Sequence, residues 1–214
     1  MYTLYGKKGS GSAAIEAALT IVGAPFRQVE TASWDQNAAF PELLVVNPLG
    51  QIPTLVLADG SAISESAAIL IYLCDVHRDS GLLPTGPSER AHAVRGLVFI
   101  AANCYAAISV IDFPERWCTG ADDDDALKDR IRSGSRARLH RYWEIFADLF
   151  PARPWLSGER MGALDLHAAV VSKWSGARAH LAQHRPALLA TLQRVETHPR
   201  VADVFSRHWP PKKT

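Results

Sequence analysis

The chain changes character at a segment rich in glycine and proline, residues 79–87. Before it, short β-branched and aromatic runs alternate with stretches of helical periodicity, a pattern typical of a small α/β unit. After it, apolar residues recur at helical spacing and no convincing strand is visible. A length of 214 residues allows two small domains. We therefore predict an α/β domain over 1–78, a linker over 79–87 and an all-helical domain over 88–214.

The first 78 residues are expected to hold four strands and three helices. The strands are predicted at 2–5, 25–30, 54–57 and 61–63, and the helices at 13–22, about 41–45 and 64–74. Gly23 stands where a helix ends in the left-handed conformation, and Asp59–Gly60 is a strong two-residue hairpin signal. Ser64 is the expected N-cap of the last helix. The order strand-helix-strand, loop, hairpin, helix predicts a mixed sheet.

Helical periodicity continues through most of the second half. Helices are predicted at 88–112, 126–150, 162–175, about 186–196 and 199–209. Four aspartates, 122–125, are placed at or just before the start of the second of these helices, where carboxylates oppose the positive end of the helix dipole. Gly162 is the expected N-cap of the third helix, and Asp165 can reach back to it. Met161 with Leu166 makes a hydrophobic staple there.

Charge and cysteine content exclude several kinds of function. The 23 Lys and Arg against 22 Asp and Glu leave a net charge of +1, whereas proteins that coat nucleic acid need an excess of cations. Cys74, Cys104 and Cys118 are odd in number and far apart, so they form no disulfide framework and indicate a reducing compartment. The eight histidines show no ligand spacing, so no metal site is expected.

Segments that direct a chain to or through a membrane are not visible in the sequence. The chain starts with Met-Tyr-Thr-Leu-Tyr, without the basic and apolar regions of a signal peptide. No apolar run approaches the roughly 20 residues that span a bilayer. We therefore expect a soluble, cytoplasmic protein that binds neither nucleic acid nor membrane.

The step Gln51-Ile52-Pro53-Thr54 is the most informative local feature. A proline at the start of a strand donates no ladder hydrogen bond. If the Ile52–Pro53 bond is cis, the N–H and C=O of Ile52 point outward and can pair with an extended peptide as if it were another strand. Since only about 5% of X-Pro bonds are cis, the spacing by itself favours a trans turn.

A wider pattern changes that preference. The segment NPLGQIP from Asn47 to Pro53 precedes the hairpin, and SESAAI from Ser64 to Ile69 opens the next helix. With the Pro-rich linker and the all-helical second half, the whole chain resembles a cytosolic glutathione S-transferase, nearest to the bacterial beta class. The resemblance implies a thioredoxin-like α/β N-terminal domain plus an all-α C-terminal domain. It also implies a cytoplasmic homodimer that acts in detoxification, with glutathione as co-substrate and no other cofactor.

The element at Gly162 resembles the capping box that the family carries in the buried helix of its second domain. That box normally begins with Ser or Thr, whose side chain bonds the helix in return. Glycine has no such side chain. We therefore expect only half of the reciprocal bonding, from Asp165, with the staple retained.

The resemblance also assigns a glutathione-binding role to five residues. Ile52, before the cis-proline Pro53, would bond the backbone of the cysteinyl residue. Glu65 would accept from the ligand ammonium, while Ser66 and the helix N-terminus receive the γ-glutamyl carboxylate. The side chain of Gln51 is a further candidate contact. The alternative is that the polar residues at this helix start only cap the helix.

The catalytic position is left open between two serines. Counting from the strand, the family's beta-class cysteine falls on Ser10; counting back from Gly23, it falls on Gly11, with Ser12 next. We favour Ser10, because Ser12 suits an N-cap. Tyr5, within the strand, is expected to pack in the core. No cysteine lies in this loop, which argues against mixed-disulfide chemistry, since that needs a protein thiol.

A serine hydroxyl is sufficient for conjugation chemistry. A thiol of pKa near 8.5 is only a few per cent ionised at pH 7. A charge-assisted hydrogen bond contributes about 1.5–3 kcal/mol and one pKa unit is about 1.4 kcal/mol, so one hydroxyl lowers the thiol pKa by about one to two units. The thiolate would then belong to the ligand and not to the protein.

The helical domain is expected to hold the second substrate, a small hydrophobic electrophile. Beta-class members present polar residues there from the first long helix. The matching segment, 103–107, lacks their His-Lys pair, and Asn103 and Tyr105 are its candidate residues. Arg116 and Trp117 are further candidates, with a surface or core role as the alternative. We predict a glutathione transferase. The alternatives are a glutathione-dependent isomerase or dehalogenase, and a non-catalytic binding or interaction protein on the same fold.

Overall fold

The computed structural model describes residues 1–35, 37–120 and 124–210. Its sheet has four strands in the spatial order β2-β1-β3-β4, with bounds Tyr2–Gly6 for β1, Phe26–Glu30 for β2, Thr54–Val56 for β3 and Ala62–Ile63 for β4. β1 pairs with β2 in parallel and with β3 antiparallel, and β3 pairs antiparallel with β4. This is the predicted mixed sheet of a thioredoxin-like unit.

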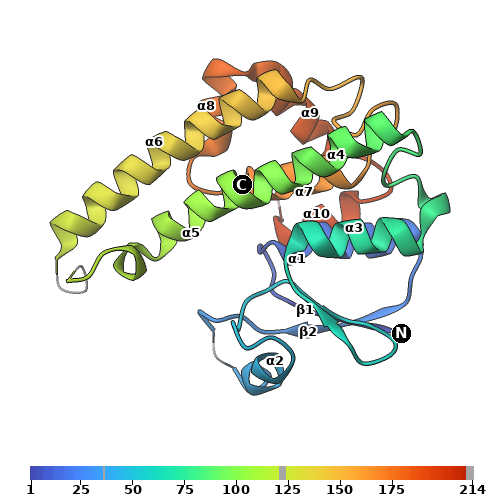
Figure 1. Ribbon diagram of the computed structural model, residues 1–214, viewed down its shortest axis with the longest axis horizontal. Coiled ribbons are helices and arrows are strands. Elements are labelled where there is room, and N and C mark those ends of the chain that lie inside the picture. Colours follow the sequence, from blue (N-terminus) through green and yellow to red (C-terminus); the bar gives the residue numbers. More distant parts are fainter. Residues whose placement is uncertain (36, 121–123, 211–214) are drawn as a thin grey trace.

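Three helices accompany the sheet (Figure 1). α1 (Ser12–Val22) and α3 (Ser66–Val76) lie between the sheet and the helices of the second half, while α2 (Phe40–Val46) lies on the sheet's other side. α1 is apolar on almost every side and buries all its residues from 12 to 19, as a helix packed between two layers requires. It ends at Gly23 with φ 68°, the left-handed stop that the sequence predicts.

The start of α3 differs from the prediction. Its N-cap is Glu65 and not Ser64, and no side chain caps it among the described residues. Glu65 has φ 65° and ψ 106°, a left-handed backbone that is uncommon for a residue with a side chain. Ser64 instead lines a cleft described below. The cap was misplaced because the turn conformation of Glu65 has no sequence signal.

Among the described residues of the second half, helices are joined by turns and loops, and the β-structure is limited to one isolated bridge between Trp155 and Gly158. Its helices are α4 (Pro87–Phe99), a π-helical stretch (Ile100–Tyr105), α5 (Ala106–Asp112), a short 3₁₀ helix (Pro114–Trp117), α6 (Asp125–Leu149), α7 (Ala163–Val171), α8 (Ala177–His184), α9 (Pro186–Glu196) and α10 (Ala202–His208). α8 was not predicted, since only two of its residues, Ala177 and Leu181, are buried. The boundaries of the two domains stay a prediction; a short 3₁₀ turn, Arg78–Ser80, spans the predicted start of the linker at residue 79.

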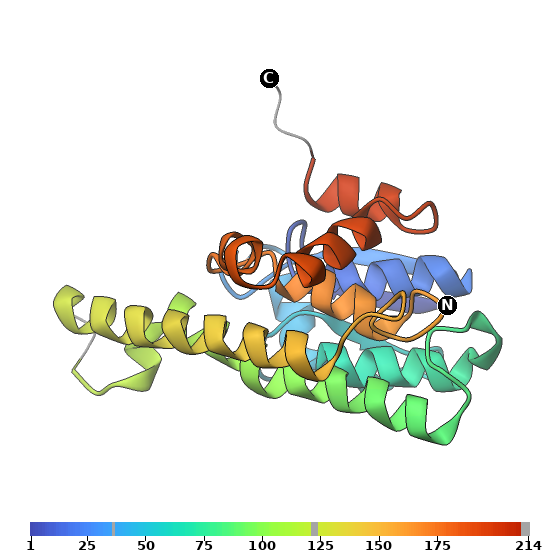
Figure 2. The same ribbon diagram turned by 90° about the horizontal axis from the view of Figure 1, so that it is seen from above.

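The helix from α4 to α5 runs on without a break and packs beside α6, as Figures 1 and 2 show. Residues Pro87–Asp112 form a 26-residue helix that is long and apolar enough to cross a membrane by length and composition. The expectation that no run approaches this length was therefore wrong. Core helices of soluble proteins meet the same criterion, and 39% of the most apolar window is buried inside the fold.

The predicted half of a capping box opens α7. The buried Asp165 carboxylate accepts from the N–H groups of Leu156 (2.8 Å), Ser157 (3.0 Å) and Gly162 (3.0 Å). Burial raises the pKa of Asp165, and these hydrogen bonds oppose that rise. A Cβ on Gly162 would lie 2.4 Å from the carbonyl oxygen of Leu82. Because the backbone at Leu82 lies so close, a residue with a side chain does not fit at position 162, and glycine stands there in place of Ser or Thr.

The acidic run before α6 is described only in part. Asp124 is the N-cap, and its carboxylate accepts from the N–H of Leu127 at 2.8 Å, which agrees with the predicted position of the run. Asp122 and Asp123 lie outside the described residues.

Candidate functional site

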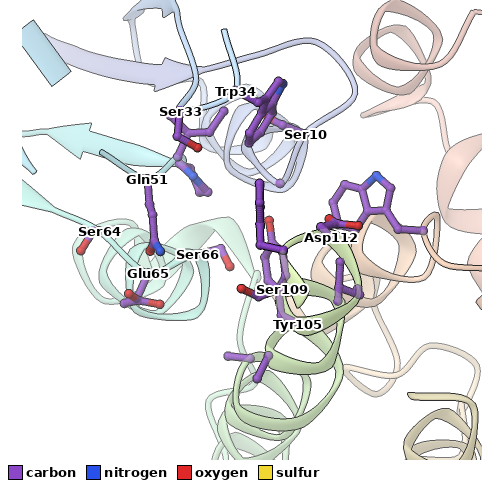
Figure 3. Close-up of a pocket in the computed structure, with 18 of the residues that line it drawn as sticks. Ser10, Ser33, Trp34, Gln51, Ser64, Glu65, Ser66, Tyr105, Ser109 and Asp112 are labelled. Atoms are coloured by element: carbon purple, nitrogen blue, oxygen red, sulfur yellow. The ribbon is translucent and has the colours of Figure 1, made fainter. Parts of the chain in front are cut away.

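A cleft of about 590 Å³ lies between the α/β unit and the helices. The α/β unit contributes four short segments to its wall: 9–11 before α1, 33–34 after β2, 51–53 before β3, and 64–66 at the start of α3. The helical half contributes residues of the π-helical stretch and α5, together with Trp174. Figure 3 shows Gln51, Glu65 and Ser66 on one side of this cleft, with Ser10 and Tyr105 across from them.

The loop before α1 separates the two candidate serines. Ser10 lines the cleft, whereas Ser12 is fully buried and does not. Their hydroxyl oxygens lie 2.8 Å apart, and the Ser12 N–H donates to Ser10 Oγ at 3.2 Å. The Ser12 hydroxyl can donate to the Lys7 carbonyl at 3.3 Å. Ser12 therefore contacts Ser10 from the buried side, and of the two hydroxyls only that of Ser10 lines the cleft.

The C-terminal helix fixes this loop. The Gly9 N–H donates to His208 Nδ1 at 3.0 Å, and His208 Nε2 lies 2.7 Å from a carboxylate oxygen of Glu16. Because Nδ1 accepts, the proton sits on Nε2 and points at Glu16. Arg207 pairs with the other Glu16 oxygen. Burial raises the pKa of Glu16, but the bonds from His208 and Arg207 outweigh it and bring that pKa below its usual value. Sequence reasoning missed all of these contacts.

Tyr105 closes the cleft against the start of α1. A Cβ on Gly11 would lie 2.2 Å from Tyr105 Oη, so the hydroxyl fills the space that a side chain at position 11 would need. The Tyr105 ring stacks on Trp174 with centroids 5.7 Å apart. Burial raises the pKa of Tyr105, so its hydroxyl stays protonated and acts as a donor. Asn103, predicted beside it, does not line the cleft; its amide donates to the Phe99 carbonyl at 3.0 Å.

The turn before β3 presents Ile52 to the cleft. The Ile52–Pro53 bond is cis, and β3 begins only at Thr54, so Ile52 lies outside the sheet ladder. The Gln51 carbonyl accepts from the Asn47 amide at 3.0 Å and from the Thr54 hydroxyl at 2.9 Å, which holds the turn in place. The exposed Gln51 side chain lines the cleft.

The start of α3 brings a carboxylate and a hydroxyl to the same cleft. Glu65 is exposed and has the left-handed backbone noted above, a conformation that costs about 1–3 kcal/mol and clusters at functional sites. Ser66 is the first residue of α3 and is buried, with its Oγ 3.0 Å from Nε2 of His167 on α7. Both residues stand at the N-terminus of α3, where the positive end of the helix dipole lies.

The three cysteines take no part in the cleft. All are unpaired, as predicted, and none lines it. Burial raises the pKa of Cys74 to about 12, and burial also raises the pKa of Cys104. Such thiols are poor nucleophiles. Within 1–35, 37–120 and 124–210, no cluster of three or more His, Cys, Asp or Glu residues is arranged to hold a metal ion.

The helical wall of the cleft is mostly apolar. Its apolar side chains come from Ala101, Ala106, Ile108, Phe113 and Trp174. Ser109, Asp112 and Arg116 add polar groups, and the Arg116 guanidinium lies 4.0 Å from the centroid of the Phe113 ring. Trp117 does not line the cleft and is 59% exposed. The wall therefore suits an apolar guest with a polar end.

Fold and site together define a protein with a thioredoxin-like unit, an all-helical unit and a ligand cleft between them. A family model for the glutathione S-transferase N-terminal domain matches residues 12–76. The GST-like protein YncG of Escherichia coli K12 is 30% identical over 209 residues, 97% of this chain and 98% of its own length. The chain belongs to the glutathione S-transferase family.

Two further comparisons agree. The glutathione S-transferase GstA of Escherichia coli O157:H7 is 27% identical over 166 residues, 77% of each chain. The crystal structure of a glutathione transferase homolog from Sulfitobacter, solved with bound glutathione, superposes with a TM-score of 0.83 over 95% of this chain and 96% of its own. Its sequence identity is 22%, so this likeness concerns the fold.

Proposed function

We propose that the protein is a glutathione transferase, which ionises the thiol of glutathione in the cleft and joins it to an apolar electrophile. The observation that carries the proposal is that Ser10, Ile52 and Glu65, from three separate segments, line one cleft. Family membership supports the assignment, as does the glutathione bound by the Sulfitobacter homolog.

In this proposal the α/β unit binds the tripeptide. The Ile52 backbone, beside Pro53, pairs with the cysteinyl residue like a neighbouring strand. Glu65 accepts from the ligand ammonium, and Ser66 with the first N–H groups of α3 receives the γ-glutamyl carboxylate. Gln51, whose side chain is exposed to the cleft, adds a polar contact. These assignments place complementary groups at the γ-glutamyl end and at the cysteinyl residue of the ligand.

Ser10 is proposed to stabilise the thiolate. Its hydroxyl donates to the sulfur next to the N-terminus of α1, where the helix dipole also favours an anion. The thiol proton leaves to water, and a sulfur lone pair then forms the bond to the electrophilic carbon. The electron pair displaced there leaves with the departing group or is protonated by water. Ser12 acts indirectly, through its 2.8 Å contact with the Ser10 oxygen.

The electrophile is proposed to lie against the apolar wall of the helical half, beside Tyr105. The Tyr105 hydroxyl is a donor for negative charge that develops on the sulfur or on the electrophile during transfer. Asn103 is left out of this assignment, because its amide bonds the Phe99 carbonyl within its own helix. We also propose, from the family, a cytoplasmic homodimer.

Retention on immobilised glutathione tests the binding half of the proposal. We expect the wild type to be retained and Glu65→Ala to be lost, while Glu159→Ala, an exposed glutamate away from the cleft, behaves like the wild type. A wild type that flows through and shows no heat of binding to glutathione in calorimetry overturns the proposal.

Product analysis tests the chemical half. A transferase consumes free glutathione in proportion to product. If free glutathione is unchanged while the second substrate is converted, the protein is a glutathione-dependent isomerase. Release of halide with glutathione recovered indicates a dehalogenase. Tight binding without turnover across a panel of electrophiles indicates a non-catalytic binding protein.

A further inference from the structure

A buried histidine of the helical half reaches the glutathione end of the cleft. His167 lies on α7 and is 1% exposed, and its Nε2 is 3.0 Å from the Oγ of Ser66, 101 residues earlier in the chain. Ser66 lines the cleft at the N-terminus of α3. The proposed catalytic step does not use His167, and no sequence pattern singled it out.

The surroundings of His167 decide which ring nitrogen holds the proton. Burial lowers the pKa of His167 to about 3, so the ring is neutral near pH 7 and has one N–H. Nδ1 is buried and has no hydrogen-bond partner among the described residues. A proton on Nδ1 would leave an orphaned buried donor, which is rarer in proteins than an under-used acceptor. The proton therefore sits on Nε2 and is donated to Ser66.

Because His167 Nε2 donates, Ser66 Oγ is the acceptor in this hydrogen bond. A serine hydroxyl has one proton and two lone pairs. When one lone pair accepts from His167, the proton remains free to be donated to a group in the cleft. The positive end of the α3 dipole favours a negative charge at the same place. The His167–Ser66 pair therefore favours binding of a carboxylate over binding of a neutral group or a hydrogen-bond donor.

We propose that His167 is a positioning residue: it donates from Nε2 to Ser66 Oγ, and it thereby aims the Ser66 proton at the α-carboxylate of the γ-glutamyl group. The inference rests on the proposed function, because that function supplies the ligand. His167 thus contributes a contact from the helical half to the groups proposed to bind the γ-glutamyl end, which otherwise come from the α/β unit. Since the ring is neutral, His167 orients the site without adding charge to it.

The test measures how much more tightly the protein binds a ligand with the α-carboxylate than the same ligand without it. Calorimetry compares glutathione with 4-aminobutyryl-cysteinyl-glycine, which lacks only the α-carboxylate. We expect the wild type to prefer glutathione, and His167→Phe to lose about tenfold of this preference, the scale of one charge-assisted hydrogen bond. Ser66→Ala should lose a similar factor, and the double variant no more than either single variant.

Three controls separate positioning from packing. His167→Gln can donate from its amide and should keep most of the preference. Val170→Ala, another fully buried change on α7, should lower the melting temperature and leave the preference unchanged. Long-range proton–nitrogen NMR spectra of the wild type should show His167 protonated at Nε2.

The outcomes that overturn the inference are distinct. A folded His167→Phe with the wild-type preference, a His167→Gln that loses as much as His167→Phe, or a ring protonated at Nδ1 each overturns it while leaving the proposed function intact. A wild type that binds neither peptide overturns the proposed function, and this inference falls with it.

Discussion

Ser10 Oγ and Ser12 Oγ lie 2.8 Å apart, yet only Ser10 lines the cleft. The Ser12 hydroxyl is buried behind Ser10, within reach of both the Lys7 carbonyl and Ser10 Oγ. When Ser12 donates its one proton to Ser10 Oγ, the proton of Ser10 is free to be donated into the cleft. A ligand thiolate would therefore meet Ser10 directly and feel Ser12 only through it.

This arrangement predicts unequal effects of the two serines on the thiol pKa of bound glutathione. Ser10→Ala removes the direct donor and should raise that pKa by about one to two units. Ser12→Ala should raise it by less. Ultraviolet difference titration of the thiolate in the complex measures both. If neither variant shifts the pKa, serine activation is rejected, and a larger shift for Ser12→Ala would reverse the assignment.

The close approach of Tyr105 to Gly11 predicts a coupled pair. Gly11→Ala sets a methyl group 2.2 Å from Tyr105 Oη, and such overpacking costs about 1–3 kcal/mol of unfolding free energy. Tyr105→Phe removes the crowding atom, so the cost of Gly11→Ala should be smaller in that background. Denaturant unfolding of the wild type, the two single variants and the double variant gives the coupling free energy between the two positions. Strict additivity would contradict the contact.

Tyr105→Phe also has a predicted catalytic effect. Without the hydroxyl, we expect the transfer rate to fall about tenfold while the affinity for glutathione changes little, because the lost hydrogen bond acts during transfer. Steady-state kinetics with a standard aromatic electrophile, alongside calorimetry, separates the two quantities. An unchanged rate would assign Tyr105 to packing against Trp174.

The pair of Glu16 and His208 predicts a loss of stability in acid. The folded-state pKa of Glu16 is lowered from 4.5, so the unfolded state takes up a proton first as the pH falls. The contribution of Glu16 is therefore present above pH 4.5 and is lost as the pH falls through its lower folded value. Glu16→Gln should flatten this part of the stability curve. Urea midpoints measured between about pH 6 and pH 3 test it, and equal slopes in the two proteins would contradict it.

The close contact at Gly162 predicts that a serine there, the residue usual in the family, does not stabilise the protein. Adding an N-cap serine ordinarily stabilises a helix by about 0.5–2 kcal/mol. Here the Cβ of Gly162→Ser would lie 2.4 Å from the Leu82 carbonyl oxygen, so we expect a loss of about 1–3 kcal/mol instead. Gly162→Ala, which has the same Cβ but cannot cap, should lose at least as much. A higher melting temperature for Gly162→Ser would show that the segment around Leu82 can move away from the added side chain.

The sequence by itself determined the order of elements and several of their ends. Gly23 ends α1, and the Asp165 carboxylate reaches back to Gly162, as predicted. The Ile52–Pro53 bond is cis, which spacing did not favour and the family pattern did. These features depend on neighbours within a few residues or on a motif, so the local chain encodes them. Where the local signal was weak, as in α8, or misleading, as at Ser64, prediction failed.

Only the tertiary structure decided how the cleft is assembled. His167 reaches Ser66 across 101 residues, and His208 reaches Gly9 across 199. That Ser10 and Tyr105 line the cleft, whereas Ser12 and Asn103 do not, likewise depends on how the chain packs. Periodicity places a residue on a helix, but it does not say which element packs against that residue. The partner comes from the packing of the whole chain, and these contacts follow from it.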